Sequence, residues 1–132
     1  MTFKNLFIFS SIVALAFGLP LLFAPQSIFD MYSVDKTNLS SSVTHVSRCY
    51  GGMLIAFGIG GFIALKAAPS HGRKSLLAIT TINAGITTIL NILAIKNGVE
   101  NSNAWITVIV VGAIAIMAGM LLSKEEIEMA RK

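Results

Sequence analysis

Charged side chains are scarce in this chain. Only 12% of its 132 residues are Asp, Glu, Lys or Arg, whereas 55% are hydrophobic. A soluble domain has about a quarter of its residues charged, so this composition excludes an ordinary soluble fold. The formal net charge of +4 does not indicate a nucleic-acid partner, because the basic residues lie between apolar segments rather than in one stripe.

The residues that familiar enzyme sites need are also missing. The single cysteine, Cys49, cannot form an intrachain disulfide bond. The long apolar segments contain no Asp or Glu for acid–base chemistry or a proton relay. The sequence has no Gly-rich phosphate loop before a helix and no His-rich cluster for heme or a di-metal site. We therefore expect no enzymatic activity and no cofactor.

Four long apolar segments dominate what is present. Each is about as long as the 20 residues that a helix needs to cross a hydrocarbon core about 30 Å thick. The segments must be helical, since lipid offers unpaired backbone groups no partner, and they lack the alternation of barrel strands. The sequence predicts an all-α, single-domain, integral membrane four-helix bundle. Its helices are expected at about residues 6–24, 43–66, 74–96 and 103–123, with a cytoplasmic helical tail at 124–132.

The first apolar segment has some features of a signal peptide. Lys4 precedes an apolar stretch, and Ala14-Leu15-Ala16 resembles a cleavage site. The apolar run nevertheless continues through Pro20 to Ala24, which is too long for a signal peptide. We expect this segment to remain as the first transmembrane helix.

Basic residues are distributed unequally between the two sides of the predicted bundle. The side with both termini holds Lys4, Lys66, Arg73, Lys74, Lys124, Arg131 and Lys132. The other side holds Lys36 and Lys96, with Arg48 at the membrane edge. Because Lys and Arg accumulate in cytoplasmic loops, we expect both termini to be cytoplasmic, in a prokaryotic cytoplasmic membrane. Trp105 and Tyr32 would then lie at the outer interface.

The loop between the first two predicted helices contains an apolar stretch of its own. Ile28, Phe29, Met31 and Tyr32 follow Pro25 at roughly helical spacing, and proline suits the first position of a helix. We predict a short helix lying in the outer interface. An irregular apolar loop is the alternative.

Small residues recur every fourth position in the second predicted helix. They are Gly52, Ala56, Gly60 and Ala64. Glycine lowers helix propensity, and close contact with another helix would explain its presence, because membrane helices associate through small residues. We predict that this ladder packs against a neighbouring helix; a groove for a lipid or a partner protein is the alternative.

The third predicted helix has a polar stripe. Thr80, Asn83, Thr87 and Asn91 fall within an arc of about 80° at 100° per residue. Unpaired amides in hydrocarbon cost several kcal/mol, so the stripe should face protein or water. It would either form interhelical hydrogen bonds or line a polar cavity, which makes Asn83, Thr87 and Asn91 candidate ligand- or partner-binding residues.

His45 and Arg48, at the start of the second predicted helix, are costly to place near a bilayer and are therefore candidate binding residues. Arg48 could bind a lipid phosphate, and His45 could carry a proton or bind a metal. Alternatively, Arg48 extends to the interface and pairs with Asp30 or Asp35.

The same helix also carries three residue types that bind metals. His45, Cys49 and Met53 follow one another at spacings of four, and their side chains all suit copper. No second helix supplies matching His or Cys residues, so these three are only weak metal candidates.

Part of the sequence resembles a family. Phe29-Asp30-Met31-Tyr32, then Val43-Thr44, then Arg48-Cys49-Tyr50-Gly51-Gly52 resemble small four-helix membrane proteins of the DoxX-like kind and the ergosterol-biosynthesis scaffold family. The resemblance covers about residues 20–65. It implies a non-catalytic partner of membrane oxidoreductases, with Arg48 and Gly51 as the positions carried over.

Three functions are compatible with these features. The first is a non-catalytic accessory or scaffold subunit of a larger membrane complex, with other integral membrane subunits, a second copy and lipids as partners. The second is a membrane protein that binds a lipid- or quinone-like molecule, with Arg48, His45 and the polar stripe lining the pocket. Copper handling is the third and weakest.

Overall fold

The computed structural model describes residues 2–35 and 37–130, and for 126–130 the backbone alone. It confirms the all-α class. The elements are α1 (Phe3–Phe23), α2 (Pro25–Tyr32), α3 (Ser41–Ile63), the 3-10 turn η1 (Ala64–Lys66), α4 (His71–Lys96) and α5 (Ala104–Ala130). All but α2 and η1 are long and apolar enough to cross a membrane, as in an integral membrane protein. Residues 131–132 of the predicted tail lie outside the described residues.

Hydroxyl side chains mark where three of the long helices begin. The hydroxyl of Thr2 accepts a hydrogen bond from the backbone of Asn5, and Ser40 and Ser70 cap α3 and α4 in the same way. Such caps satisfy backbone N–H groups that have no partner within the first turn. The apolar stretch after Pro25 is a helix, α2, with the proline in its first turn.

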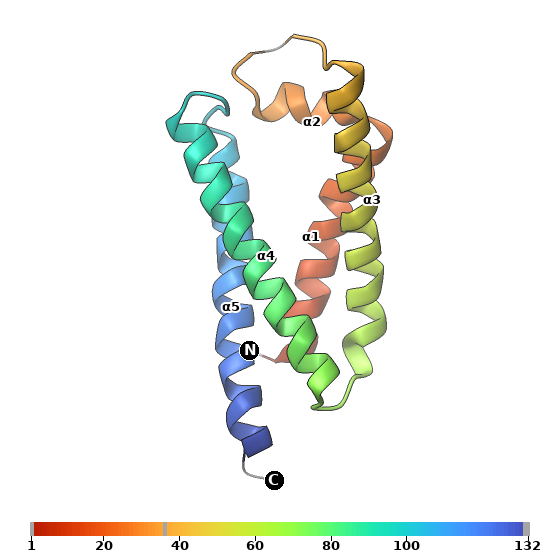
Figure 1. Cartoon of the computed structure of the whole chain (residues 1–132), viewed down its shortest axis with the longest axis vertical. Coiled ribbons are helices and arrows are strands. Elements are labelled where there is room, and N and C mark those ends of the chain that lie inside the picture. Colours follow the sequence, from red (N-terminus) through yellow and green to blue (C-terminus); the bar gives the residue numbers. More distant parts are fainter. Residues whose placement is uncertain (1, 36, 131–132) are drawn as a thin grey trace.

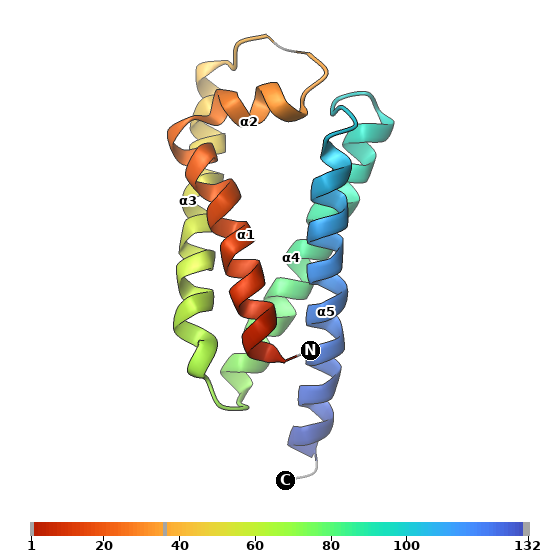
Figure 2. The same ribbon diagram turned by 180° about the vertical axis from the view of Figure 1, so that it is seen from behind.

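The long helices form two pairs. α1 packs along α3, and α4 packs along α5. Figure 1 shows the two pairs side by side, with α2 crossing one end, and Figure 2 shows the same arrangement from behind. We call this the α2 end; the start of α1, the α3–α4 connection and the end of α5 lie toward the opposite, terminal end.

Glycines bring α1 and α3 into close contact. A Cβ atom on Gly51 would lie 2.6 Å from the backbone nitrogen of Leu22 and 2.8 Å from the carbonyl oxygen of Gly18. One on Gly58 would lie 2.9 Å from Cγ of Leu15. Only glycine fits at such distances, so these positions define the packing face of α3.

The prediction that the small-residue ladder of α3 packs against a neighbouring helix of the chain was therefore wrong. Gly52 and Gly60 have nothing within 4 Å of a would-be Cβ, and Ala56 is exposed. Only Ala64 packs against the core. A spacing of four advances about 40° around a helix at each step, whereas the seven residues from Gly51 to Gly58 drift by only about 20°, so the latter pair stays on one face.

The α4–α5 pair uses the same spacing of seven. Gly112 would place a Cβ 3.4 Å from Cγ2 of Thr88, and Gly119 would place one 3.5 Å from Cγ2 of Thr81. The hydroxyls of these threonines donate instead to carbonyls of their own helix, at 2.8 Å. Methyl groups therefore form the contact, and no hydroxyl is left unpaired in it.

At the terminal end the two pairs meet in a hydrophobic cluster. It contains Phe3, Leu6, Phe7, Leu77, Ala84, Ile114, Ala118 and Leu121. Arg73 of α4 forms an ion pair there with Glu125 of α5. This end of the bundle is therefore closed by side chains from α1, α4 and α5.

At the α2 end, the α4–α5 loop is bonded to the end of α2. The backbone of Val34 donates to the carbonyl of Val99 at 3.1 Å, and that of Asn101 donates to the carbonyl of Tyr32 at 2.7 Å. The side-chain amide of Asn101 donates to the carbonyl of Met31 at 3.0 Å. These bonds join the two helix pairs at this end.

Candidate binding cavity between the helix pairs

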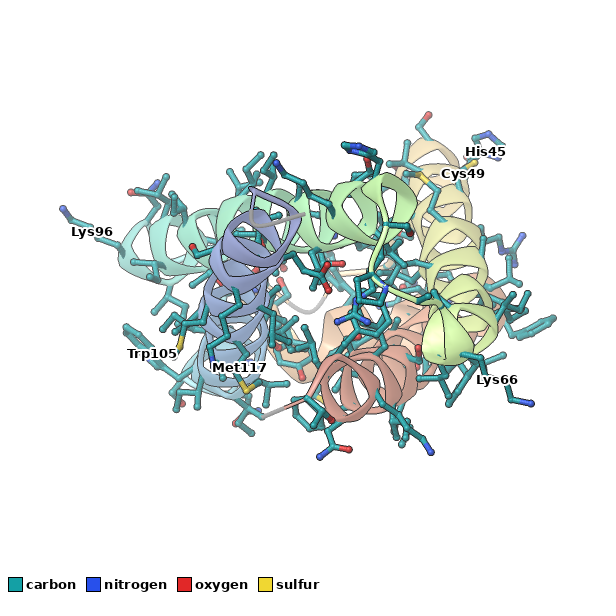
Figure 3. The ribbon with its side chains drawn as sticks, turned by 90° about the horizontal axis from the view of Figure 1, so that it is seen from below. His45, Cys49, Lys66, Lys96, Trp105 and Met117 are labelled. Carbon is teal, nitrogen blue, oxygen red and sulfur yellow. The ribbon has the colours of Figure 1, made fainter. Side chains whose placement is uncertain are left out.

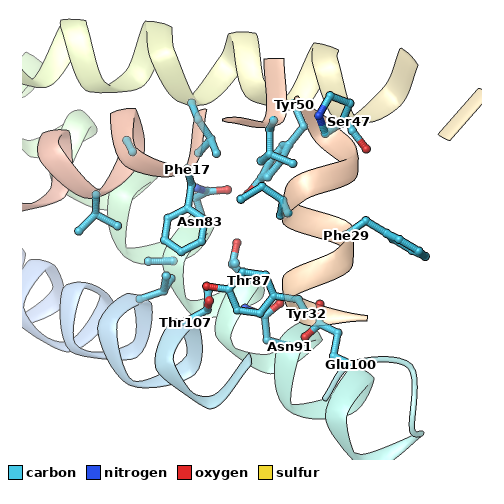
Figure 4. A pocket seen from close by; sticks show the side chains of 18 of the residues that line it. Phe17, Phe29, Tyr32, Ser47, Tyr50, Asn83, Thr87, Asn91, Glu100 and Thr107 are labelled. Carbon is cyan, nitrogen blue, oxygen red and sulfur yellow. The ribbon is translucent and has the colours of Figure 1, made fainter. Parts of the chain in front are cut away.

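A cavity of about 380 Å³ lies between the two helix pairs, beneath α2. Figure 4 shows its interior. Side chains from α1, α2, α3, α4, α5 and the α4–α5 loop line it. The helix pairs meet at the terminal end and are joined by hydrogen bonds at the α2 end. The cavity exists because the pairs do not pack against each other in the region between these two ends.

One side of the cavity is apolar. α1 and α3 contribute Val13, Phe17, Leu21, Leu54 and Phe57. Val111 and Ile114 of α5 extend this surface. Such a wall offers dispersion contacts to a hydrocarbon chain and no hydrogen bonds.

The polar stripe of α4 faces this apolar wall. Asn83, Thr87 and Asn91 line the cavity (Figure 4), and within residues 2–35 and 37–130 no hydrogen bond joins their side chains to another helix. Thr80 also lines it, but its hydroxyl donates to the carbonyl of Leu76 at 2.8 Å. The interhelical hydrogen bonds that the sequence allowed are thus not formed, and the amide and hydroxyl groups remain available to a ligand.

Further polar groups come from other elements. The remaining polar lining residues are Ser10, Tyr32, Ser33, Ser47, Tyr50, Glu100 and Thr107. Tyr32, Asn91 and Glu100 gather at the α2 end of the cavity (Figure 4). The cavity is therefore amphipathic, with its polar groups on α4 and toward the α2 end.

Glu100 is the functional candidate that the sequence analysis missed. Its Oε2 is buried and has no hydrogen-bond partner among the described residues. Burial raises the pKa of this carboxyl above its ordinary value of 4.5. One feature of the sequence could have pointed to it: Glu100 is the one acidic residue in the short polar loop from Asn97 to Asn103.

The backbone explains why Glu100 faces inward. Gly98 has a φ of 70°, a left-handed conformation that ends helices and that glycine adopts without steric cost. The backbones of Val99 and Glu100 then donate back to the carbonyl of Ala94 at 2.9 and 3.2 Å. The pairing of Glu100 with Ser33 holds the loop against α2.

A second pocket lies beside the cavity, between α3 and α4. A smaller pocket of about 170 Å³ shares Tyr50, Leu54, Phe57 and Asn83 with it. Met53 and Ile79 also line this pocket and are 69% and 57% exposed. In a membrane, Met53 and Ile79 would contact lipid, so this lateral pocket lies between the cavity and the bilayer.

His45 and Arg48 do not line the cavity, which corrects the prediction that they do. Both are exposed, and Figure 3 shows His45 at the periphery of the bundle. The face of α3 that lines the cavity is Ser47, Tyr50, Leu54 and Phe57. Arg48 follows Ser47 and is therefore rotated about 100° away from that face.

The alternative pairing of Arg48 with Asp30 or Asp35 is also not seen in the described structure. Asp30 accepts a hydrogen bond from the amide of Gln26 at 2.7 Å, and Asp35 accepts one from the backbone of Thr37 at 3.1 Å. Among the described side chains, the one ion pair joins Arg73 and Glu125. Arg48 therefore has no ion-pair partner among the described side chains.

The weak metal candidates lie together on the outside of α3. The Nε2 atom of His45 is 3.6 Å from Sγ of Cys49, and both lie at the edge of the bundle in Figure 3. In the part of the chain that the structure describes, no three His, Cys, Asp or Glu residues cluster as a metal site would require. The copper hypothesis thus rests on His45, Cys49 and Met53 alone.

Comparison with known proteins adds no relative. No family model, curated protein or solved structure matches the chain. The DoxX-like resemblance stays a prediction from the residues that suggested it. Of the two positions carried over, Gly51 forms the closest contact of α3 with α1, and Arg48 faces outward.

Proposed function

We propose that this protein binds one small amphipathic molecule, lipid-like or quinone-like, drawn from the surrounding bilayer. The observation that carries this proposal is the cavity of about 380 Å³, in which an apolar wall faces the unpartnered polar side chains of α4. Its volume falls within the range of about 300–1,000 Å³ that is usual for small-molecule sites.

A ligand in the cavity would lower the free energy of the polar stripe. An amide that is buried in hydrocarbon without a hydrogen-bond partner costs about 2–7 kcal/mol. A ligand whose head group bonded to Asn83 and Asn91 would remove part of that cost. Its tail would gain contacts with the apolar side of α1 and α3.

The lateral pocket supports the bilayer as the source of the ligand. An amphipathic molecule dissolved in the membrane could pass between α3 and α4, beside Tyr50 and Met53, without crossing water. Both sit where the smaller pocket meets the outside of the bundle. A chain with this geometry would store, present or transfer its ligand rather than transform it.

A cavity-filling variant tests this proposal. Thr107 lines the cavity, whereas its neighbour Ile106 is 61% exposed on the outside of α5. We expect Thr107→Phe to reduce the amount of copurified amphiphile at least severalfold, and Ile106→Phe to leave it unchanged. Mass spectrometry of extracts from the purified protein measures this. Equal retention by wild type and Thr107→Phe would refute the proposal.

A second function is favoured by the outer face of α3. Gly52, Ala56 and Gly60 form a strip of small residues that no other helix of the chain covers in the described structure. Such strips allow a second membrane helix to approach closely. We propose, as the alternative, a non-catalytic accessory subunit that docks through this face. Purification in mild detergent should then yield a larger complex that Gly60→Leu disrupts, and a functional monomer would contradict it.

A further inference from the structure

The charges that line the cavity are all of one sign. Glu100 is acidic, and the lining residues within 2–35 and 37–130 include no Lys, Arg or His; the other titratable side chains among them are Tyr32 and Tyr50. Among the described lining residues, a head group that enters this cavity therefore meets one carboxylate and no basic side chain that would pair with a phosphate or a carboxylate of its own.

We propose that the ligand carries a single positive charge, as an amine or a quaternary ammonium, and that the Glu100 carboxylate binds it. This inference rests on the proposed binding function and specifies the ligand class. Two observations support it: Glu100 lines the cavity, and its buried Oε2 has no hydrogen-bond partner within the described residues.

The surroundings of Glu100 suit a cation. The rings of Phe17 and Tyr32 lie with their centres 6.2 Å apart, and both line the cavity. Aromatic faces attract ammonium groups electrostatically. Figure 4 shows Tyr32 and Asn91 beside Glu100, so a cationic head would find a carboxylate, an aromatic ring and an amide oxygen at one end of the cavity.

Other head groups fit this site less well. An anionic head would be repelled by Glu100 and would lack a partner of its own. A zwitterionic phospholipid would bring a phosphate into a cavity whose described lining contains no basic residue. A neutral head could bond to Asn83 or Asn91, but it would leave the Glu100 carboxylate without a counter-charge, which is costly in a partly buried position.

The shape of the cavity sets the orientation of the ligand. Glu100 and Tyr32 belong to the α2 end, whereas Leu54 and Phe57 lie further along α3 and border the lateral pocket. The charged head would therefore sit beneath α2, and the alkyl chain would run toward the opening between α3 and α4.

A set of amphiphiles with identical tails tests the inference. Decyltrimethylammonium, decanol and decyl phosphate are titrated into the full-length protein in phosphatidylcholine nanodiscs at about pH 7.5, with empty nanodiscs as the blank. We expect decyltrimethylammonium to bind about tenfold or more tightly than decanol, because loss of one partner of a desolvated charge pair costs at least that factor. Decyl phosphate should bind most weakly.

Variants of Glu100 separate charge from structure. Glu100→Gln should remove the preference for the ammonium but keep the affinity for decanol, whereas Glu100→Asp should retain much of the preference. Asp30→Asn is the matched control, since it removes the same charge from the exposed surface of α2 and lies outside the lining. Circular dichroism verifies that each variant is folded.

The possible failures are distinguishable. If decanol binds as tightly as decyltrimethylammonium, or if Glu100→Gln leaves the preference intact, the cationic ligand class is wrong while the binding function stands. If decyl phosphate binds best, the inference is likewise overturned. If none of the three binds, or if Thr107→Phe weakens none of them, the proposed function itself fails.

Discussion

Arg73 and Glu125 form an ion pair between the first turn of α4 and the last part of α5, at the terminal end of the bundle. The guanidinium of Arg73 also lies 4.2 Å from the centre of the Phe3 ring and donates to the carbonyl of Ala67 at 3.3 Å. One side chain thus contacts α1, α5 and the α3–α4 connection. Glu125 is only 2% exposed, so Arg73 is the partner that offsets the burial of its carboxylate.

Loss of Arg73 should destabilise the bundle. Arg73→Ala leaves the buried Glu125 carboxylate without its partner, and such a change costs about 3–5 kcal/mol. We expect a clear fall in the midpoint of thermal unfolding in detergent. Lys124→Ala, a change at the exposed neighbouring residue, is the control and should be close to neutral. An equal effect of the two variants would contradict a structural role for the ion pair.

Adjacent glycines on α3 should respond oppositely to alanine. Gly51→Ala places a methyl group 2.6 Å from the backbone nitrogen of Leu22, and overpacking of this kind costs about 1–3 kcal/mol. Gly52→Ala meets nothing within 4 Å and gains up to about 1 kcal/mol of helix propensity. Unfolding in detergent measures both. A destabilising Gly52→Ala would indicate that a partner covers the outer face of α3.

The stability of the ligand-free protein should depend on pH through Glu100. Burial raises the pKa of this group in the folded state above the ordinary value of 4.5, so the folded state binds its proton more tightly. The stability contributed by the neutral acid is complete below pH 4.5 and is lost as the pH rises through the raised pKa. Glu100→Gln should remove this dependence. Melting curves between about pH 4 and 8 measure this dependence. If the wild type and Glu100→Gln lose stability in parallel as the pH rises, Glu100 is not its source.

The orientation expected from the basic residues can be tested with single cysteines. In a Cys49→Ser background, Asn38→Cys lies in the α2–α3 connection and Ala68→Cys in the α3–α4 connection, and both positions are exposed. If both termini are cytoplasmic, a membrane-impermeant maleimide should label Asn38→Cys in intact cells, and Ala68→Cys only after permeabilisation. The reverse labelling pattern would show that both termini lie on the outer side of the membrane.

Some of the architecture follows from the sequence alone. The length and hydropathy of the four segments determine the number of candidate crossings, since only a helix satisfies its backbone hydrogen bonds within a bilayer. The spacing of Asn83, Thr87 and Asn91 determines that they share one face of α4. Thr87 and Asn91 line the cavity, and Asn83 borders both the cavity and the smaller pocket beside it.

Only the tertiary structure decided which faces meet. Membrane helices are apolar around most of their circumference, so hydropathy did not distinguish the Gly51–Gly58 face of α3 from the Gly52–Gly60 face, or show that Arg48 points outward. The inward position of Glu100 depends on the left-handed turn at Gly98 and on pairing with Ser33. Contacts between residues far apart in the chain, such as Arg73 with Glu125, arise from the packing of whole helices.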